Sequence, residues 1–174
     1  MKKAFTSLTP QEALHVAIFI EERNAEVYHH FAEMFAEFRD GKSLEIASVF
    51  WDMATEEHHH STLLQQRYME CYGNASCALT EDDVQELIEV PRLESSNLFD
   101  EYDDPAKSSA RERAFLVALA AENNARSFYA ELAGVTVDFR LRTLYRELAE
   151  YEQDHVEFLE KRITQSSSNK HSPS

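Results

Sequence analysis

The sequence contains few residues that turn or break a chain. Only 3 Gly and 4 Pro occur among its 174 residues. A β-sandwich or β-barrel needs turn residues at short intervals, so this composition excludes those classes and favours long helices. Hydrophobic residues make up 43% and charged residues 28%, which is typical of a globular chain and excludes a disordered one. The length suits one domain with a buried core.

Basic side chains, long apolar runs and cysteines are also scarce. Lys plus Arg number 17 against 32 Asp plus Glu, a net charge of -15 that disfavours binding to nucleic acid or anionic membranes. No apolar run approaches the roughly 18 residues of a membrane span. Glu21 and Glu22 directly follow the apolar stretch near the start, so we interpret it as a helix and not a signal peptide. Cys71 and Cys77 are too few for a disulfide framework, which favours a reducing cytoplasmic setting.

Two long helices are expected in the first half of the chain. Residues 9–12 (Thr-Pro-Gln-Glu) form a capping box with Pro at the first helical position. Asp40-Gly41 breaks this helix, Ser43 can cap the next one, and Gly73 ends it. The helices are predicted at residues 10–38 and 43–72.

The second half predicts another helical pair. Residues 109–112 (Ser-Ala-Arg-Glu) form a second capping box, Gly134 ends that helix, and a further helix begins near Val137. The tail, QSSSNKHSPS, is polar and is expected to be disordered. The predicted elements are helices at 109–134 and 137–163 and a tail at 165–174.

These elements predict an all-α fold of two αα-hairpins. Short links make the helices of each pair antiparallel neighbours. Residues 73–108 form a long acidic crossover between the pairs, with a short helix that Thr80 caps. A four-helix bundle of the ferritin-like kind has this connectivity, and we expect it to form one domain over residues 1–164.

The two hairpins repeat the same pair of patterns in the same order. Residues 22–28 and 122–128 both match Glu-x-Asn-Ala-x-x-aromatic. Residues 53–60 and 148–155 both match apolar-Ala-x-x-Glu-x-x-His. The glutamate of each segment interrupts an apolar stripe at helical spacing, so each is predicted to face the bundle core. These residues are Glu22, Glu57, Glu122 and Glu152.

Four carboxylates in one core predict a metal site. Burying them costs several kcal/mol each, and they could not all ionise at close range without cations among them. Two divalent cations balance four negative charges. His60 and His155, each three residues after a core glutamate, would add one nitrogen ligand per metal.

Other Glu-x-x-His pairs compete with this interpretation. Glu12 is a capping residue, so its spacing to His15 is a coincidence of helix structure. The pair Glu56 and His59 lies one step off the apolar stripe and stays an alternative to Glu57 and His60. His29 could support or replace a ligand or pack as a polar core residue. Tyr129 could donate a hydrogen bond to a ligand carboxylate or serve in packing.

Residues 10–163, with these paired patterns, resemble rubrerythrin, within the ferritin-like superfamily. The resemblance implies that Glu22 and Glu122 are terminal ligands and that Glu57 and Glu152 bridge two irons. It also implies that His60 and His155 bind one iron each. Rubrerythrins carry a further helix glutamate where this sequence has Ala125, and the paired CxxC of a rubredoxin domain is absent from these residues. The remaining ligand set is also similar to bacterioferritin.

We therefore expect two iron ions per chain, with Mn or Zn as substitutes. Such a centre would oxidise Fe(II) with O2 or H2O2, as a ferroxidase or peroxidase in iron handling or oxidant defence. An external electron donor would be needed, and the resemblance implies a homodimer. The alternatives are a di-iron oxygenase acting on an organic substrate and a non-catalytic bundle that carries iron or binds a partner.

Overall fold

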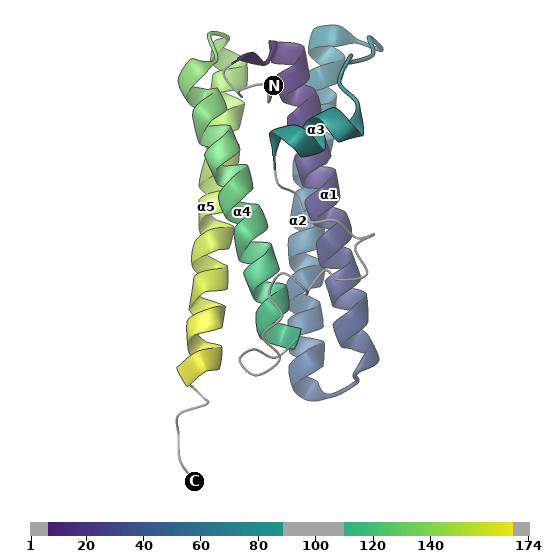
Figure 1. Cartoon of the computed structure of the whole chain (residues 1–174), viewed down its shortest axis with the longest axis vertical. Helices are drawn as coiled ribbons and strands as arrows, with labels where there is room; N and C mark the ends of the chain where they lie inside the picture. The colour runs from purple at the N-terminus through teal and green to yellow at the C-terminus, as the bar shows by residue number, and fades with distance from the viewer. Residues whose placement is uncertain (1–6, 89–109, 169–174) are drawn as a thin grey trace.

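Four long helices form an elongated bundle, and a short helix lies against the side of it, near one end (Figure 1). The computed structural model describes residues 7–88 and 110–168. The described helices are α1 (Pro10–Glu37), α2 (Gly41–Tyr72), α3 (Glu81–Leu87), α4 (Ala110–Val135) and α5 (Phe139–Ser168). The all-α fold and its two helix pairs, α1 with α2 and α4 with α5, are as predicted.

The start of α1 follows the predicted capping box, whereas the start of α2 differs from the expectation. Thr9 accepts the backbone N–H of Glu12, and the Glu12 side chain accepts the N–H of Thr9. Asp40, not Ser43, caps α2, because its Oδ1 accepts the Ser43 N–H at 3.0 Å. Arg111 from α4 also donates to Asp40 at 3.0 Å. The hydrogen bonds from Ser43 lower the pKa of Asp40, so the cap stays charged.

The remaining helix ends agree closely with the sequence signals. Gly73 ends α2 with φ of 59°, a left-handed conformation that suits a residue without Cβ. Thr80 caps α3 through the Asp83 N–H. The expected capping box at Ser109 and the crossover from 89 to 108 lie outside the described residues. Helix α5 continues to Ser168, past the predicted start of the tail at residue 165.

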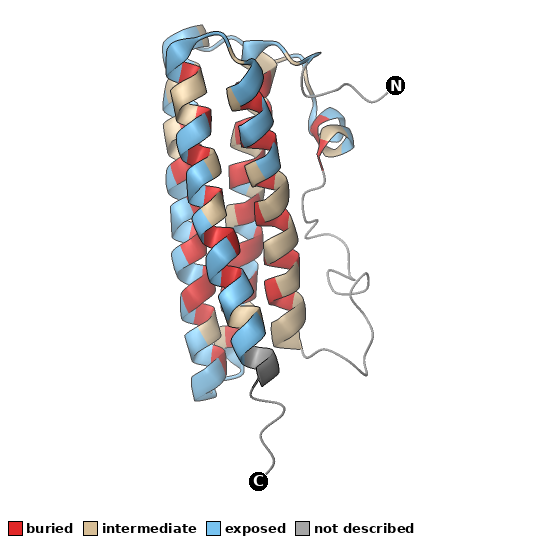
Figure 2. Ribbon diagram, turned by 90° about the vertical axis from the view of Figure 1, so that its left-hand side faces the viewer, coloured by how far each residue is buried: buried red, intermediate tan, exposed pale blue. Residues whose placement is uncertain are grey.

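Two apolar clusters fill the bundle above and below a polar layer. One cluster lies toward the end of the bundle near α3, and α3 contributes Val84 to it. The other lies toward the loop between α1 and α2, where Phe31, Phe35 and Phe50 pack together. The buried residues follow the inward faces of the long helices (Figure 2). None of the described helices contains an apolar stretch that could span a bilayer.

Candidate metal centre

The polar layer consists of buried acids and imidazoles, at least one from each long helix. Four glutamates have no exposed surface, and two histidines are only 6% and 9% exposed. The glutamates lie between the two apolar clusters, in the middle of the bundle. The residues are Glu21 on α1, Glu57 and His60 on α2, Glu122 on α4, and Glu152 and His155 on α5.

The structure corrects the prediction that Glu22 faces the core. Glu22 is exposed and accepts a hydrogen bond from Gln65 at 2.6 Å, whereas Glu21 is fully buried. One residue along a helix turns a side chain by about 100°, so neighbouring residues cannot share a face. Glu21 lies on the stripe that also buries Ala17 and Tyr28, four residues before it and seven after.

A signal in the sequence could have identified Glu21. Matching Asn-Ala in the two hairpins aligned Glu22 with Glu122, and this alignment is one residue out of register. The correct register pairs a glutamate with a tyrosine seven residues later, as in Glu21 with Tyr28 and Glu122 with Tyr129. That spacing is two helical turns, so each tyrosine lies on the same face as its glutamate.

The six buried residues form two groups that overlap. In each group, one oxygen or nitrogen atom per residue lies within 4.8 Å of the others. One group consists of Glu21, Glu57, His60 and Glu152, and the other consists of Glu57, Glu122, Glu152 and His155. Glu57 and Glu152 therefore belong to both groups, whereas each group has its own third glutamate and its own histidine.

Each histidine points its Nδ1 atom at the carboxylates. His60 Nδ1 lies 3.2 Å from Glu21 Oε2 and 3.8 Å from Glu152 Oε1. The Nδ1 atom of His155 lies 3.3 Å from Glu57 Oε1 and 3.4 Å from Glu122 Oε2. The two ring centroids are 6.3 Å apart, and the Nδ1 atoms of both rings lie within 4.0 Å of Glu57 and Glu152.

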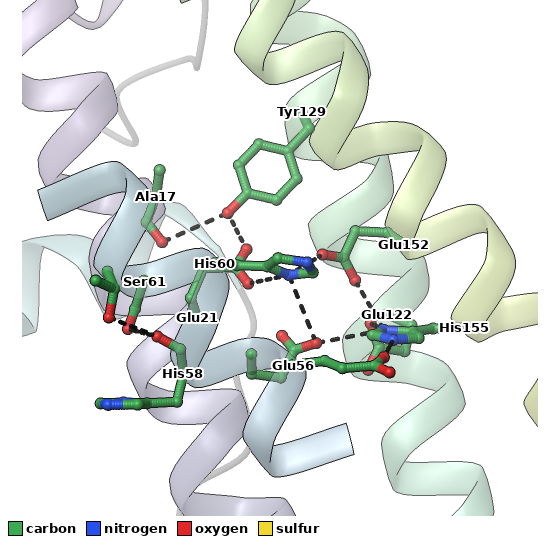
Figure 3. Close-up of polar contacts among 12 residues, drawn as sticks. Ala17, Glu21, Glu56, His58, His60, Ser61, Glu122, Tyr129, Glu152 and His155 are labelled. Carbon is green, nitrogen blue, oxygen red and sulfur yellow. Dashed lines mark hydrogen bonds and ion pairs between the residues drawn. The ribbon is translucent and has the colours of Figure 1, made fainter. Parts of the chain in front are cut away.

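Two tyrosines connect the hairpins in a reciprocal manner. Tyr28 on α1 donates to Glu122 on α4. Tyr129 on α4 donates to Glu21 on α1 (Figure 3). The predicted hydrogen bond from Tyr129 to a core carboxylate is therefore present, although Tyr28 was missed. Burial, followed by the nearby carboxylates, raises the pKa of both phenols well above 10.0, so both remain donors at neutral pH.

The competing histidines lie away from the buried acids. His29 is exposed, approaches Glu33 at 3.7 Å and packs edge-on against Trp51. His59 is also exposed, so Glu57 and His60, and not Glu56 and His59, point inward. Glu56 does approach the layer, because its Oε2 lies 2.6 Å from Nε2 of His155.

The electrostatics of the layer favour protons or cations. Burial, reinforced by the other carboxylates, raises the pKa of Glu57 and Glu152 well above 4.5. Burial opposes charge on Glu122 too, but its contacts with Glu152, His155 and Tyr28 outweigh this effect and lower its pKa. Burial also disfavours charged His155, yet contacts with Glu122, Glu152 and Glu57 raise its pKa. Ionisation of all four carboxylates would therefore leave excess negative charge in the layer, which only bound protons or cations could balance.

The donor set fits a pair of divalent cations. Neither carboxylate oxygen of Glu57 or of Glu152 accepts a hydrogen bond from the described residues. The amide atoms of Asn24, a residue only 1% exposed, are equally without partners among those residues. Buried polar atoms normally form hydrogen bonds, so the two shared glutamates, whose oxygens have only longer contacts with His60 and His155, indicate that a ligand completes the site. Four carboxylates and two divalent cations also balance in charge.

The family follows from comparison with known proteins. The family model described as Rubrerythrin matches residues 12–108, more than half of the chain. The chain belongs to the rubrerythrin family. The match includes the Glu21, Glu57 and His60 side of the layer, whereas the described part of the second hairpin lies outside it. For a rubrerythrin-family bundle, buried clusters of carboxylate and imidazole are candidate di-metal sites.

A solved structure supports the fold over the whole bundle. An uncharacterized conserved protein from Magnetospirillum magnetotacticum MS-1 is similar with a TM-score of 0.69 and 24% identity. The similarity covers 91% of this chain and 95% of the other. At this identity the likeness shows that both hairpins share the fold of that protein. No curated protein is similar enough to this rubrerythrin-family chain to count as a match.

Proposed function

We propose that this chain binds two iron ions in the buried layer and uses them to reduce an oxidant. Glu21 and His60 would hold one ion, Glu122 and His155 would hold the other, and Glu57 and Glu152 would bridge both. The observation that supports this proposal is the overlap of the two groups. Both groups contain Glu57 and Glu152, and each also contains one glutamate and one histidine that the other group lacks.

The chemistry of the donors favours iron over softer metals. Carboxylates with one imidazole per ion suit Fe(II), and Mn(II) and Zn(II) are the competitors. The Cys71 and Cys77 thiols are free, and neither belongs to the two groups. The excess negative charge of the chain favours the approach of Fe(II) over that of anions.

When bound, two Fe(II) ions would supply two electrons, which is the number that converts one H2O2 and two protons into two waters. The protein residues prepare this reaction by position and by exclusion of water. Tyr28 and Tyr129 hold the terminal carboxylates by hydrogen bonds that link the two hairpins. The apolar clusters on either side separate the layer from solvent. Each turnover would require two electrons from an external donor.

Two surface grooves formed by described residues give less support to an oxygenase that acts on an organic substrate. One groove of about 610 Å³ lies between α1 and α2 and contains His29, Trp51 and His58. Another of about 880 Å³ lies between α4 and α5 and contains Arg126, Arg146 and other polar residues. Neither groove is lined by a residue of the buried layer, so neither would place an organic substrate beside the metals.

Anaerobic Fe(II) titration followed by oxidant tests the proposal. We expect two ions per chain and an absorbance rise on addition of H2O2 or O2. Faster oxidation by H2O2 would indicate a peroxidase, and faster oxidation by O2 with mineral release would indicate a ferroxidase. Glu57→Ala and Glu152→Ala should each lose both ions, because each removes a shared ligand. Glu22→Gln is the matched control and should bind two.

Failure to bind iron, or binding that survives both alanine substitutions, would contradict the proposal. Binding of two ions without oxidation by either oxidant would support a metal site but overturn the redox function.

A further inference from the structure

The two buried histidines have different partners across the bundle. The Nε2 atom of His155, on the opposite side of the ring from the core acids, lies 2.6 Å from Oε2 of Glu56 on α2. The ring of His60 instead stacks on Tyr151 of α5, with 5.3 Å between centroids and 18° between planes. Figure 3 shows Glu56 directed at His155.

These two partners occupy equivalent positions in the two hairpins. Glu56 directly precedes the shared Glu57, and Tyr151 directly precedes the shared Glu152. Each reaches across to the histidine of the other hairpin. The bundle therefore presents a carboxylate to one histidine and an aromatic ring to the other at matching places in the repeat.

A carboxylate and an aromatic ring have different effects on a histidine ligand. A histidine that binds a metal through one nitrogen commonly donates its other N–H to a carboxylate, which fixes the tautomer and makes the binding nitrogen more basic. Glu56 meets this requirement for His155, since Nδ1 faces the acids while Nε2 faces Glu56. A stacked phenol orients the His60 ring but offers no negative charge to it.

We propose that Glu56 is a positioning residue for His155 and that it makes the two metal positions unequal. The position formed by Glu122 and His155 binds its ion more tightly and fills first. The position formed by Glu21 and His60 binds more weakly. This inference rests on the proposed di-metal site, but it concerns only the order and strength of binding.

The ion pair between Glu56 and His155 differs from an ordinary surface pair in its surroundings. The Glu56 side chain is 59% exposed, but the His155 side chain is only 11% exposed and lies among three buried glutamates. The exposed pair of Glu70 with Arg67, at 2.8 Å on the same helix, provides a contrast. The Glu70 side chain is 62% exposed and that of its partner Arg67 is 28% exposed, so this pair involves no fully buried group.

Stepwise titration of the metal-free protein with Co(II), followed by its absorbance bands, tests the proposal. The wild type should bind two ions in two steps. Glu56→Gln should weaken the tighter step by about 10–100-fold and leave the weaker one unchanged, since loss of such an outer partner has this effect. Glu70→Gln, matched in helix and exposure, should change neither step. Tyr151→Glu should strengthen the weaker step by placing a carboxylate beside His60.

Single-site backgrounds assign the effect to one position. In His60→Ala, which keeps the His155 position, adding Glu56→Gln should weaken Co(II) binding by the same factor. In His155→Ala, adding Glu56→Gln should have no effect. Equal effects in both backgrounds would indicate a general loss of structure or charge and would overturn the proposal. Two unchanged steps in Glu56→Gln would also overturn it, while a wild type that binds no Co(II) would refute the underlying metal site as well.

Discussion

The two hairpins build equivalent halves of one polar layer and surround them with different side chains. In both, a glutamate on the first helix precedes a tyrosine by seven residues, and the second helix carries the Glu-x-x-His pair. The tyrosines cross over reciprocally, Tyr28 to Glu122 and Tyr129 to Glu21. The surroundings differ, because the first hairpin has Asn24 where the second has Ala125. Groups common to both halves thus identify the site, and groups found in one half are the candidates for tuning it.

The largest expected effect comes from replacing Glu21, the buried glutamate that only one of the two groups contains. Glu21→Ala should weaken one of the two metal positions by at least about 100-fold, because a direct ligand matters more than an outer partner. Glu22→Ala removes a neighbouring acid that bonds only Gln65 among the described residues, and it should leave both positions intact. Calorimetric titration with Mn(II) or Co(II) measures both. Equal weakening by the two substitutions would contradict the assignment of Glu21.

The next effect is the pH dependence of the metal-free protein. Glu57 and Glu152 have a higher pKa in the folded protein than the ordinary value of 4.5. Their contribution to the free energy of unfolding is therefore complete below pH 4.5 and is lost as the pH rises through the folded-state pKa. The raised pKa of His155 also makes stability fall as the pH rises above 6.5. The lowered pKa of Glu122 has the opposite effect, but it reduces stability only at acidic pH, where Glu122 becomes protonated. The free energy of unfolding should therefore fall between about pH 5 and pH 8, by roughly 1 kcal/mol per pH unit or more.

Urea unfolding of the metal-free protein at several pH values measures this slope. Glu57→Gln should flatten it, because the amide has no charge to lose or gain. Saturation with metal should remove most of it, since the cations replace the protons. A metal-free wild type whose stability rises over this range would contradict the raised pKa values of the shared glutamates.

Much of the fold was predictable because helix signals are local. The capping box at Thr9, the stop at Gly73 and the cap at Thr80 each depend on a few consecutive residues, and the structure has all three. Ser43 was mistaken for a cap, because both Asp40 and Ser43 are good capping residues. Ser43 instead lies within the first turn of α2, where its N–H donates to Asp40, and Arg111 from a distant helix contacts both residues.

The buried layer was predictable in kind and less so in detail. The apolar stripes correctly placed Glu57, Glu122 and Glu152 inside, because three helices each offered one clear candidate. Two adjacent acids on α1 left the register open, and a four-residue match to the other hairpin selected the wrong one. The contacts of Tyr28 and Glu56 could not be predicted from local pattern, since both reach across to the other hairpin.

The two hydrogen bonds that Tyr28 and Tyr129 donate between the hairpins should contribute equally to the free energy of unfolding. Tyr28→Phe and Tyr129→Phe each remove a hydrogen bond to a buried carboxylate, which is worth about 1.5–3 kcal/mol. Both should lower the stability of the metal-free protein by similar amounts in urea unfolding at neutral pH. Tyr145→Phe is the matched control, because Tyr145 OH is buried without a partner among the described residues. A large loss from only one of the two substitutions would show that the hairpins are unequal here too.

The smallest effect concerns Asn24, the residue that breaks the repeat on α1. It lies between Glu21 and Tyr28 on the stripe that faces the acids, and neither of its amide atoms has a partner among the described residues. Asn24→Leu keeps the branched shape and the number of side-chain heavy atoms, and it should stabilise the metal-free protein by about 1 kcal/mol, because an unpaired buried amide is costly. The same substitution should weaken metal binding if the amide completes its hydrogen bonds only in the loaded centre. Urea unfolding of the metal-free variant and calorimetric titration with Co(II) separate the two effects. A variant that is less stable without metal would show that Asn24 is already satisfied.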